Sequence, residues 1–245
     1  MSNREIFPNA PITEALIDLR VVIDDENLTE HLATVVEQLK GEFPTVEKRV
    51  QLTFAIAPGE EPNPPNESEE IGSVLHSENR EKAIQVRING FTYSKLKPYQ
   101  DWEELRDNTR RLWSVFRDTT KPKRVVRLAS RFINRIELPL PVDFDEYFNT
   151  KIQIADELPQ GIAEQFCRIV VPQLEQGLVA VITTTLEKPG EDRTIIPFLF
   201  DIDVFKDVDY EVDADEIWDD LERIREYKDD IFFYSTTEKA KNLFR

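Results

Sequence analysis

From Ile12 to Ile23 the chain reads ITEALIDLRVVI, and apolar and polar residues alternate through most of this stretch. In an extended strand, successive side chains point to opposite faces of the sheet. The alternation therefore predicts a β-strand with one apolar face and one polar face. Glu14, Asp18 and Arg20 belong to its polar face.

The residues that follow predict a helix, three strands and a second helix. The helix is expected at 27–41, the strands at 46–57, 71–77 and 82–96, and the second helix between Asp101 and Pro122. Asp101 and Glu104 have the spacing of a capping box, in which the first side chain accepts a hydrogen bond from the helix start. Residues 1–120 therefore predict the order β-α-β-β-β-α.

Residues 121–245 predict the same order again. Strands are expected at 124–138, 162–171, 178–187 and 194–205, with a short helix at 144–148 and a long helix at 213–232. An ungapped alignment of the halves places Asp101 on Asp213 and Glu104 on Glu216, which predicts a second capping box. The alternative is that any strand followed by an amphipathic helix aligns with another.

These elements predict an α+β fold built from tandem, pseudo-duplicated β-α-β-β-β-α halves, 1–120 and 121–245, packed as one structural unit. We expect a mostly antiparallel, curved sheet with its helices on one face. That arrangement leaves the opposite sheet face open.

Composition restricts the classes of partner. The net charge is −17, and such a chain repels a phosphate backbone, so direct nucleic-acid binding is not expected. No apolar stretch is long enough to cross a membrane, and charged residues occupy the position of a signal peptide. We expect a cytoplasmic protein without membrane association. The single cysteine, Cys167, excludes an intramolecular disulfide and is expected in the core.

Charge is segregated along the chain. Residues 106–135 contain ten Lys or Arg against two Asp, and residues 201–230 contain fourteen acidic residues against four basic ones. We expect these two regions to attract each other.

An arginine row is predicted on the strand at 124–138. Alternation places Arg127, Arg131, Ile133 and Arg135 on one face, and the other face carries Val126, Leu128, Phe132 and Ile136. Guanidinium groups suit bidentate recognition of carboxylates or phosphates, so the row could bind an anionic ligand or an acidic partner segment. The other interpretation is a structural lattice of cross-strand salt bridges. The candidate binding residues are Glu14, Asp18, Arg20, Arg87, Arg127, Arg131 and Arg135.

Catalytic motifs give no positive signal. The sequence has no phosphate-binding glycine loop and no nucleophile elbow, and neither His31 nor His76 has metal ligands at the usual spacing. We therefore predict no catalytic residue and no cofactor. The alternative is a magnesium site at Asp201 and Asp203, completed by a carboxylate from the first strand.

Several stretches resemble one protein family. Residues 7–15, FPNAPITEA, followed by IDLR at 17–20, resemble the start of a sporadically distributed family of uncharacterised bacterial and archaeal proteins with an N-terminal PNAPI-x-EA motif. Further similarity lies at 131–139, 145–148, 201–203 and 218–232, so it spans nearly the whole chain. The resemblance implies no particular activity, and the family's patchy distribution suggests carriage with mobile or defence loci.

We predict a non-catalytic binding or adaptor protein that recognises a protein partner or an anionic ligand through its polar sheet face, in a bacterial defence or toxin-neutralising system. One alternative is a metal-dependent enzyme acting on a nucleotide or another anionic small molecule. Another is an acidic mimic of nucleic acid that occupies a basic partner.

Overall fold

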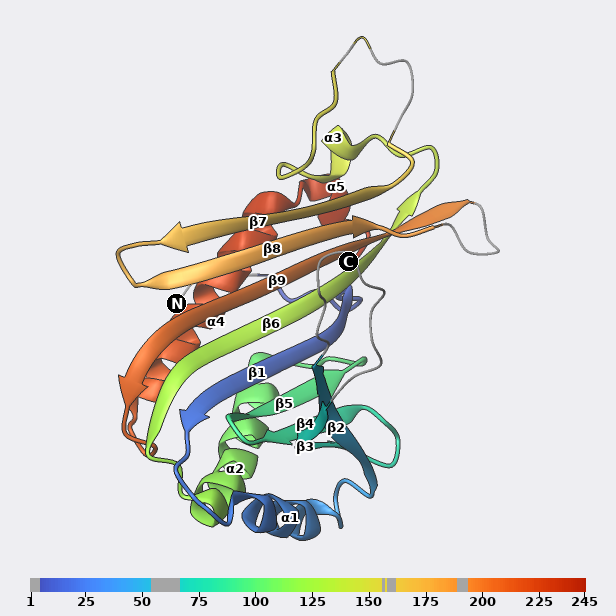
Figure 1. Ribbon diagram of the computed structural model, residues 1–245. Helices are drawn as coiled ribbons and strands as arrows, with labels where there is room; N and C mark the ends of the chain where they lie inside the picture. The colour runs from blue at the N-terminus through green and yellow to red at the C-terminus, as the bar shows by residue number, and fades with distance from the viewer. Residues whose placement is uncertain (1–4, 54–66, 156, 158–161, 189–193) are drawn as a thin grey trace, which may run out of the picture.

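The computed structural model describes residues 5–53, 67–155, 157, 162–188 and 194–245, and within them it shows an α+β fold with nine strands and five helices. All neighbouring strands pair antiparallel in one sheet of order β2-β3-β4-β5-β1-β6-β9-β8-β7 (Figure 1). The strands are β1 (Ile12–Val22), β2 (Thr45–Thr53), β3 (Glu67–His76), β4 (Lys82–Arg87), β5 (Gly90–Leu96), β6 (Arg124–Pro139), β7 (Gln165–Gln173), β8 (Leu178–Leu186) and β9 (Ile195–Tyr210). The helices are α1 (Leu28–Leu39), α2 (Trp102–Thr120), α3 (Phe144–Tyr147), α4 (Glu216–Ser235) and α5 (Glu238–Lys241).

The centre of the sheet is the pair β1 and β6, one from each half of the chain. Each of them also pairs with the last strand of its own half, β5 or β9, and the remaining strands continue outward to the edges. The sheet is therefore continuous across the boundary between residues 1–120 and 121–245.

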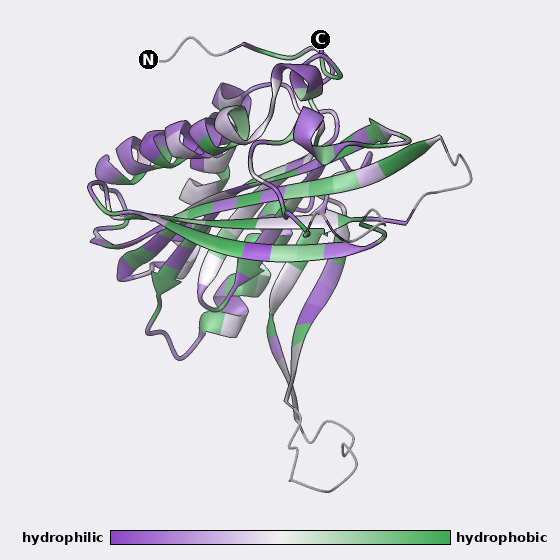
Figure 2. Ribbon diagram, turned by 90° about the horizontal axis from the view of Figure 1, so that it is seen from above, coloured by the Kyte–Doolittle hydropathy of each residue, from purple (hydrophilic) through white to green (hydrophobic). Residues whose placement is uncertain are grey.

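Helices α1, α2 and α4 pack on one face of this sheet. Helix α2 contacts β5 and β1, whereas α4 contacts β9 and β6. Leu19 of β1 lies opposite both Phe91 and Leu128, and all three are fully buried beneath the helices. Figure 2, which views the molecule from above, shows α4 on one side of the strands and the β2–β3 hairpin projecting to the other. One face is thus the hydrophobic core, and the other carries no helix of the described residues.

The strand expected at 82–96 is wrong, because β4 and β5 form a hairpin. Arg87 pairs with Gly90, which leaves Ile88 and Asn89 as the turn. A Cβ on Gly90 would lie 2.6 Å from the Leu19 carbonyl oxygen, so only glycine fits beside β1 here. Asn89-Gly90 is a strong hairpin signal in the sequence. Because β4 and β5 are separate strands, the first half has one strand more than the second.

The second capping box is also wrong. Asp101 caps α2 as predicted, because its Oδ1 accepts a hydrogen bond from the Glu104 N–H at 2.7 Å. Helix α4 instead begins after Asp215, whose side chain makes no capping hydrogen bond. Asp213 lies before the helix, so the spacing alone did not make a cap.

Two side chains are placed differently from expectation. A register shift between Val125 and Arg127 buries Val125 fully, whereas Val126 is only half-buried. Cys167 is also half-buried rather than in the core, because β7 is an edge strand of the sheet. Within the described residues, no helix is both long and apolar enough to span a membrane.

Candidate functional site: a charged lattice on the sheet face

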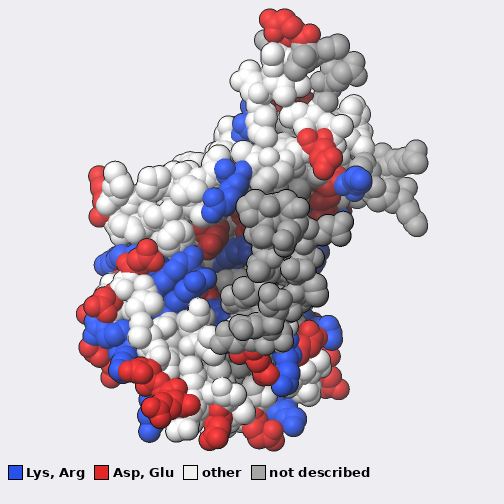
Figure 3. All heavy atoms as spheres, viewed as in Figure 1, with Lys and Arg blue, Asp and Glu red and all other residues white. Residues whose placement is uncertain are grey.

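The structure places the predicted binding residues on the sheet face opposite the helices. Along β1 the buried residues Ile17 and Leu19 alternate with Asp18 and Arg20, and β6 shows the same alternation. Basic and acidic side chains lie side by side over the middle of this face (Figure 3). The charged lattice, as we call this group, comprises Asp18, Arg20, Arg87, Arg127, Arg131, Arg135, Glu137, Glu187, Asp201 and Asp203.

Asp18 lies at the centre of one part of the lattice. Its Oδ1 accepts a hydrogen bond from Thr92 Oγ1 at 2.6 Å and another from Arg87 Nη2. Its Oδ2 lies 3.6 Å from Arg127 Nη1 and 3.8 Å from Arg20 Nε, which are ion-pair distances longer than a hydrogen bond. Three guanidinium groups from three strands therefore surround one buried carboxylate.

Arg127 lies between Asp18 and Asp203 and connects these two carboxylates of the lattice. Its guanidinium lies over the Phe205 ring, 4.3 Å from the ring centroid, and its Nη2 is 3.7 Å from Asp203 Oδ2. Only 20% of its side chain is exposed, yet its guanidinium donates no hydrogen bond to any residue in the described part of the chain. A stacked guanidinium keeps its planar edge of donors available for an acceptor.

Arg131 and Arg135 make closer pairs. Arg131 holds Asp201 in a bidentate contact, with hydrogen bonds of 2.8 Å from Nε and 2.6 Å from Nη2, and this bonding raises the pKa of Arg131. Arg135 donates to Glu187 at 3.2 Å and to Glu137 at 2.7 Å. Glu14 makes no ion pair with another described residue, although its charge also raises the pKa of Arg131.

The lattice does not fully compensate the burial of its charged groups. Burial raises the pKa of Asp203, and the nearby Arg127 and Arg131 only partly offset that effect. Asp18 Oδ2 and Arg87 Nε are buried without hydrogen-bond partners. The lattice is therefore ionically paired, but its hydrogen bonding is incomplete at Asp18, Arg87 and Arg127.

The alternative metal site at Asp201 and Asp203 gains no further ligand. Across residues 5–53, 67–155, 157, 162–188 and 194–245, no three His, Cys, Asp or Glu side chains are grouped to hold a metal ion. Asp201 is engaged by Arg131 and Asp203 faces Arg127. A hard cation would have to compete with both guanidinium groups.

Four contributors were missed from the sequence. Thr92 donates to Asp18, Phe205 supports Arg127, and both Glu137 and Glu187 accept from Arg135. Alternation could have assigned the first two to the polar face of their strands, but the strand order and register decide which residues meet. Glu187 lies one residue beyond β8, at the end of the strand that the sequence predicted at 178–187.

Comparisons with known proteins found no relative: no family model matches the chain, no curated protein matches it, and no solved structure matches it. The family resemblance stated above therefore stays a prediction.

Proposed function

We propose that this chain is a non-catalytic binding protein whose charged lattice contacts a protein partner. Arg127 carries the proposal, because its side chain is largely buried, its guanidinium is stacked on Phe205, and that guanidinium donates no hydrogen bond to another described residue. An unused guanidinium edge in a low-dielectric setting gains most from an incoming carboxylate.

The lattice also supports the sheet, and the two roles are compatible. Arg20 and Arg131 have side chains that are 53% and 43% exposed, so a partner can reach them without unfolding the sheet. A partner carboxylate could replace the protein's own carboxylate on such an arginine at little net electrostatic cost. Exchange of this kind favours specificity over raw affinity.

The whole-chain charge indicates what the partner surface carries. A net charge of −17 attracts a partner that is basic overall and speeds its encounter. The lattice itself presents both signs, so the matching surface needs one or two carboxylates for the arginines among its basic residues. We infer a basic protein that places acidic side chains on Arg127 and Arg131.

The test is to replace Arg127, Arg131 and Arg135 together with Gln and to capture partners from the native host. Quantitative mass spectrometry should show that a protein enriched by the wild type falls at least about tenfold with the variant. The matched control is Arg110→Gln, Arg111→Gln and Arg117→Gln on α2, which removes the same charge from the helix side. Equal capture by both variants, with thermal unfolding showing that both are folded, would refute the proposal.

The family resemblance supports a setting in a bacterial defence or toxin-neutralising system for this binding role. Neighbouring genes of restriction, toxin or antiviral function would agree with it. A housekeeping neighbourhood retained across hosts would contradict it.

The sheet order supports an internal duplication of the halves. In each half the first strand pairs with the last, and a long helix follows that last strand. The additional β4–β5 hairpin and the uncapped start of α4 are differences that separate the halves. Related chains whose halves align residue by residue would support duplication, and related chains with unlike halves would not.

A further inference from the structure

A cavity of about 340 Å³ lies on the helix side of β6, behind the charged lattice. It is enclosed by the N-terminal segment 5–12, the segment 97–103 and the second half of α4. Strand β6 contributes to both sites, because Phe132 and Asn134 line the cavity while Arg131 and Arg135 face the lattice. The volume is at the lower end of the range of about 300 to 1,000 Å³ that is typical of small-molecule pockets.

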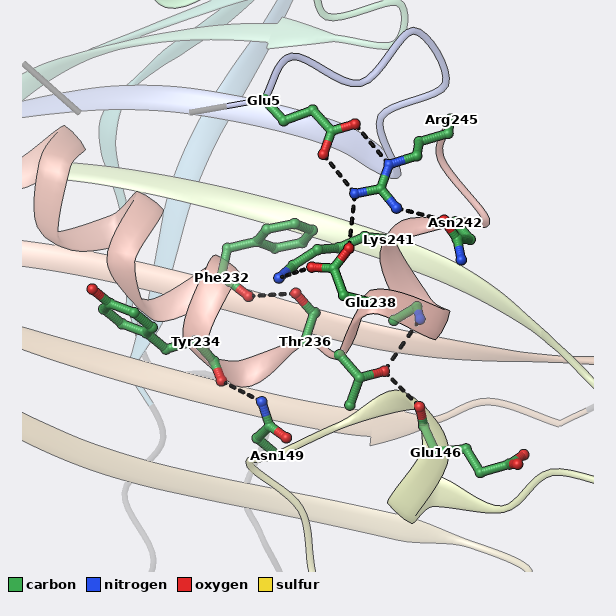
Figure 4. Close-up of polar contacts among 12 residues, drawn as sticks. Glu5, Glu146, Asn149, Phe232, Tyr234, Thr236, Glu238, Lys241, Asn242 and Arg245 are labelled. Atoms are coloured by element: carbon green, nitrogen blue, oxygen red, sulfur yellow. Dashed lines mark hydrogen bonds and ion pairs between the residues drawn. The ribbon is translucent and has the colours of Figure 1, made fainter. Parts of the chain in front are cut away.

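The N-terminal segment 5–12, which forms the roof of the cavity, is held in place by contacts with C-terminal residues. Arg245 pairs with both carboxylate oxygens of Glu5 at 2.7 Å and also bonds Glu238, as Figure 4 shows. The Phe7 ring contacts Phe233 and Phe244, with centroid distances of 5.7 Å to each. The cavity is therefore covered by a segment with defined contacts.

The floor of the cavity, formed by Phe132, Trp102 and Lys228, is aromatic and contains the ammonium group of Lys228. Phe132 and Trp102 are almost fully buried there. Lys228 places its ammonium 3.7 Å from the centroid of the Phe132 ring and pairs with Asp229, while only 8% of the residue is exposed. Because the protein's own ammonium occupies this aromatic face, a second cation would meet repulsion there.

The positive charge of the lining is more deeply buried than most of its negative charge, which favours an anion. Lys228 is buried, whereas the lining residues Glu5, Asp101 and Glu103 are exposed to solvent, which screens their charge. Asp229 pairs with Lys228 and lies 3.6 Å from Arg225 Nε, and Arg225 also lies 3.7 Å from Glu222 Oε2.

Tyr99 adds a polar group to the same wall. Its ring packs edge-on against Phe132, with the centroids 5.4 Å apart, and burial raises the pKa of its hydroxyl. That hydroxyl has no hydrogen-bond partner among the residues that the structure describes. It is therefore protonated at neutral pH and available as a donor.

We propose that this cavity binds a small aromatic carboxylic acid of one or two rings. The ring packs among the aromatic side chains, and the carboxylate pairs with the Lys228 ammonium. This ligand site is separate from the charged lattice and does not depend on the partner proposed for it. Ligand pockets of this kind combine apolar walls with a few polar groups that fix orientation.

Three probes that share one ring system test the proposal on the intact protein. Indole-3-acetate carries a negative charge, indole carries none, and tryptamine carries a positive charge. Calorimetry and ligand-observed NMR should rank the affinities in that order. Ala10→Phe, which fills the cavity from its roof, and Lys228→Met, which removes the ammonium, should each weaken indole-3-acetate at least about tenfold.

Lys40→Met, at the residue that follows α1, is the matched control, because it removes one lysine outside the cavity lining and should leave binding unchanged. Tighter binding of tryptamine, or equal binding of the three probes, would overturn the assignment of an acid. Unchanged binding by the Ala10→Phe variant would place the probe outside the cavity. The order of the three probe affinities for the wild-type protein tests the proposal even where a variant fails to fold.

Discussion

At the residue scale, Asp203 shows how burial sets the energetics of the charged lattice. Burial raises its pKa, so the folded state retains the proton to a higher pH than the unfolded state does. Below the unfolded pKa both states are protonated and the residue has no effect on stability. As the pH rises through the window between the two pKa values, ionisation increasingly favours the unfolded state.

Replacing Asp203 with Asn should therefore stabilise the protein at pH 7, because the amide has nearly the same shape and does not ionise. The gain in the free energy of unfolding should vanish below about pH 3, where the wild-type carboxyl is protonated in both states. Denaturant unfolding of both proteins at a series of pH values measures this difference in the free energy of unfolding. Asp207→Asn, at an exposed position of the same strand, is the control. A variant that is less stable than wild type at pH 7 would show that the contact with Arg127 outweighs burial.

At the element scale, alternation and helical spacing predicted most of the elements and missed what depends on turns and caps. The long patterns of β1 and β6 gave both strands and their polar faces. The hairpin between β4 and β5 was missed because apolar residues continue through its turn, although Asn89-Gly90 marks it. The start of α4 was misplaced because Asp213 has the right spacing but lies outside the helix.

Helix α4 is joined to β9 through Asp220, which is fully buried. Burial opposes the ionisation of Asp220, but hydrogen bonds from Lys206 at 2.7 Å, Tyr210 at 2.8 Å and Arg223 at 2.6 Å outweigh it and lower its pKa. Its stabilisation is therefore present at neutral pH and is lost as the pH falls through the folded pKa.

Asp220→Ala should lower the free energy of unfolding by about 3 kcal/mol, because it leaves the partly buried Lys206 without its carboxylate. Chemical denaturation at pH 7 measures the loss, and the difference from wild type should shrink in acid. Asp219→Ala, at the neighbouring exposed position, should change stability by less than about 0.5 kcal/mol. Equal effects of the two substitutions would contradict this account of how α4 is held.

At the scale of the whole molecule, the candidate sites depend on strand order, which the sequence pattern does not specify. Alternation placed Arg127, Arg131 and Arg135 on one face, and the structure agrees. It could not show that β9 lies beside β6, which brings Phe205 beneath Arg127 and Asp201 against Arg131. The cavity was beyond prediction for the same reason, since its walls come from separate segments of the chain.

The most direct measurement of the binding role is an NMR spectrum of the arginine side-chain Nε–H groups, recorded with and without the partner captured by the wild type. The guanidinium resonances of Arg127 and Arg131 should shift on binding, because new carboxylate acceptors change their hydrogen bonding. Those of Arg110 and Arg117 on α2 should stay in place. Shifts confined to the α2 arginines, with Arg127 and Arg131 unmoved, would contradict the proposal that the charged lattice is the contact surface.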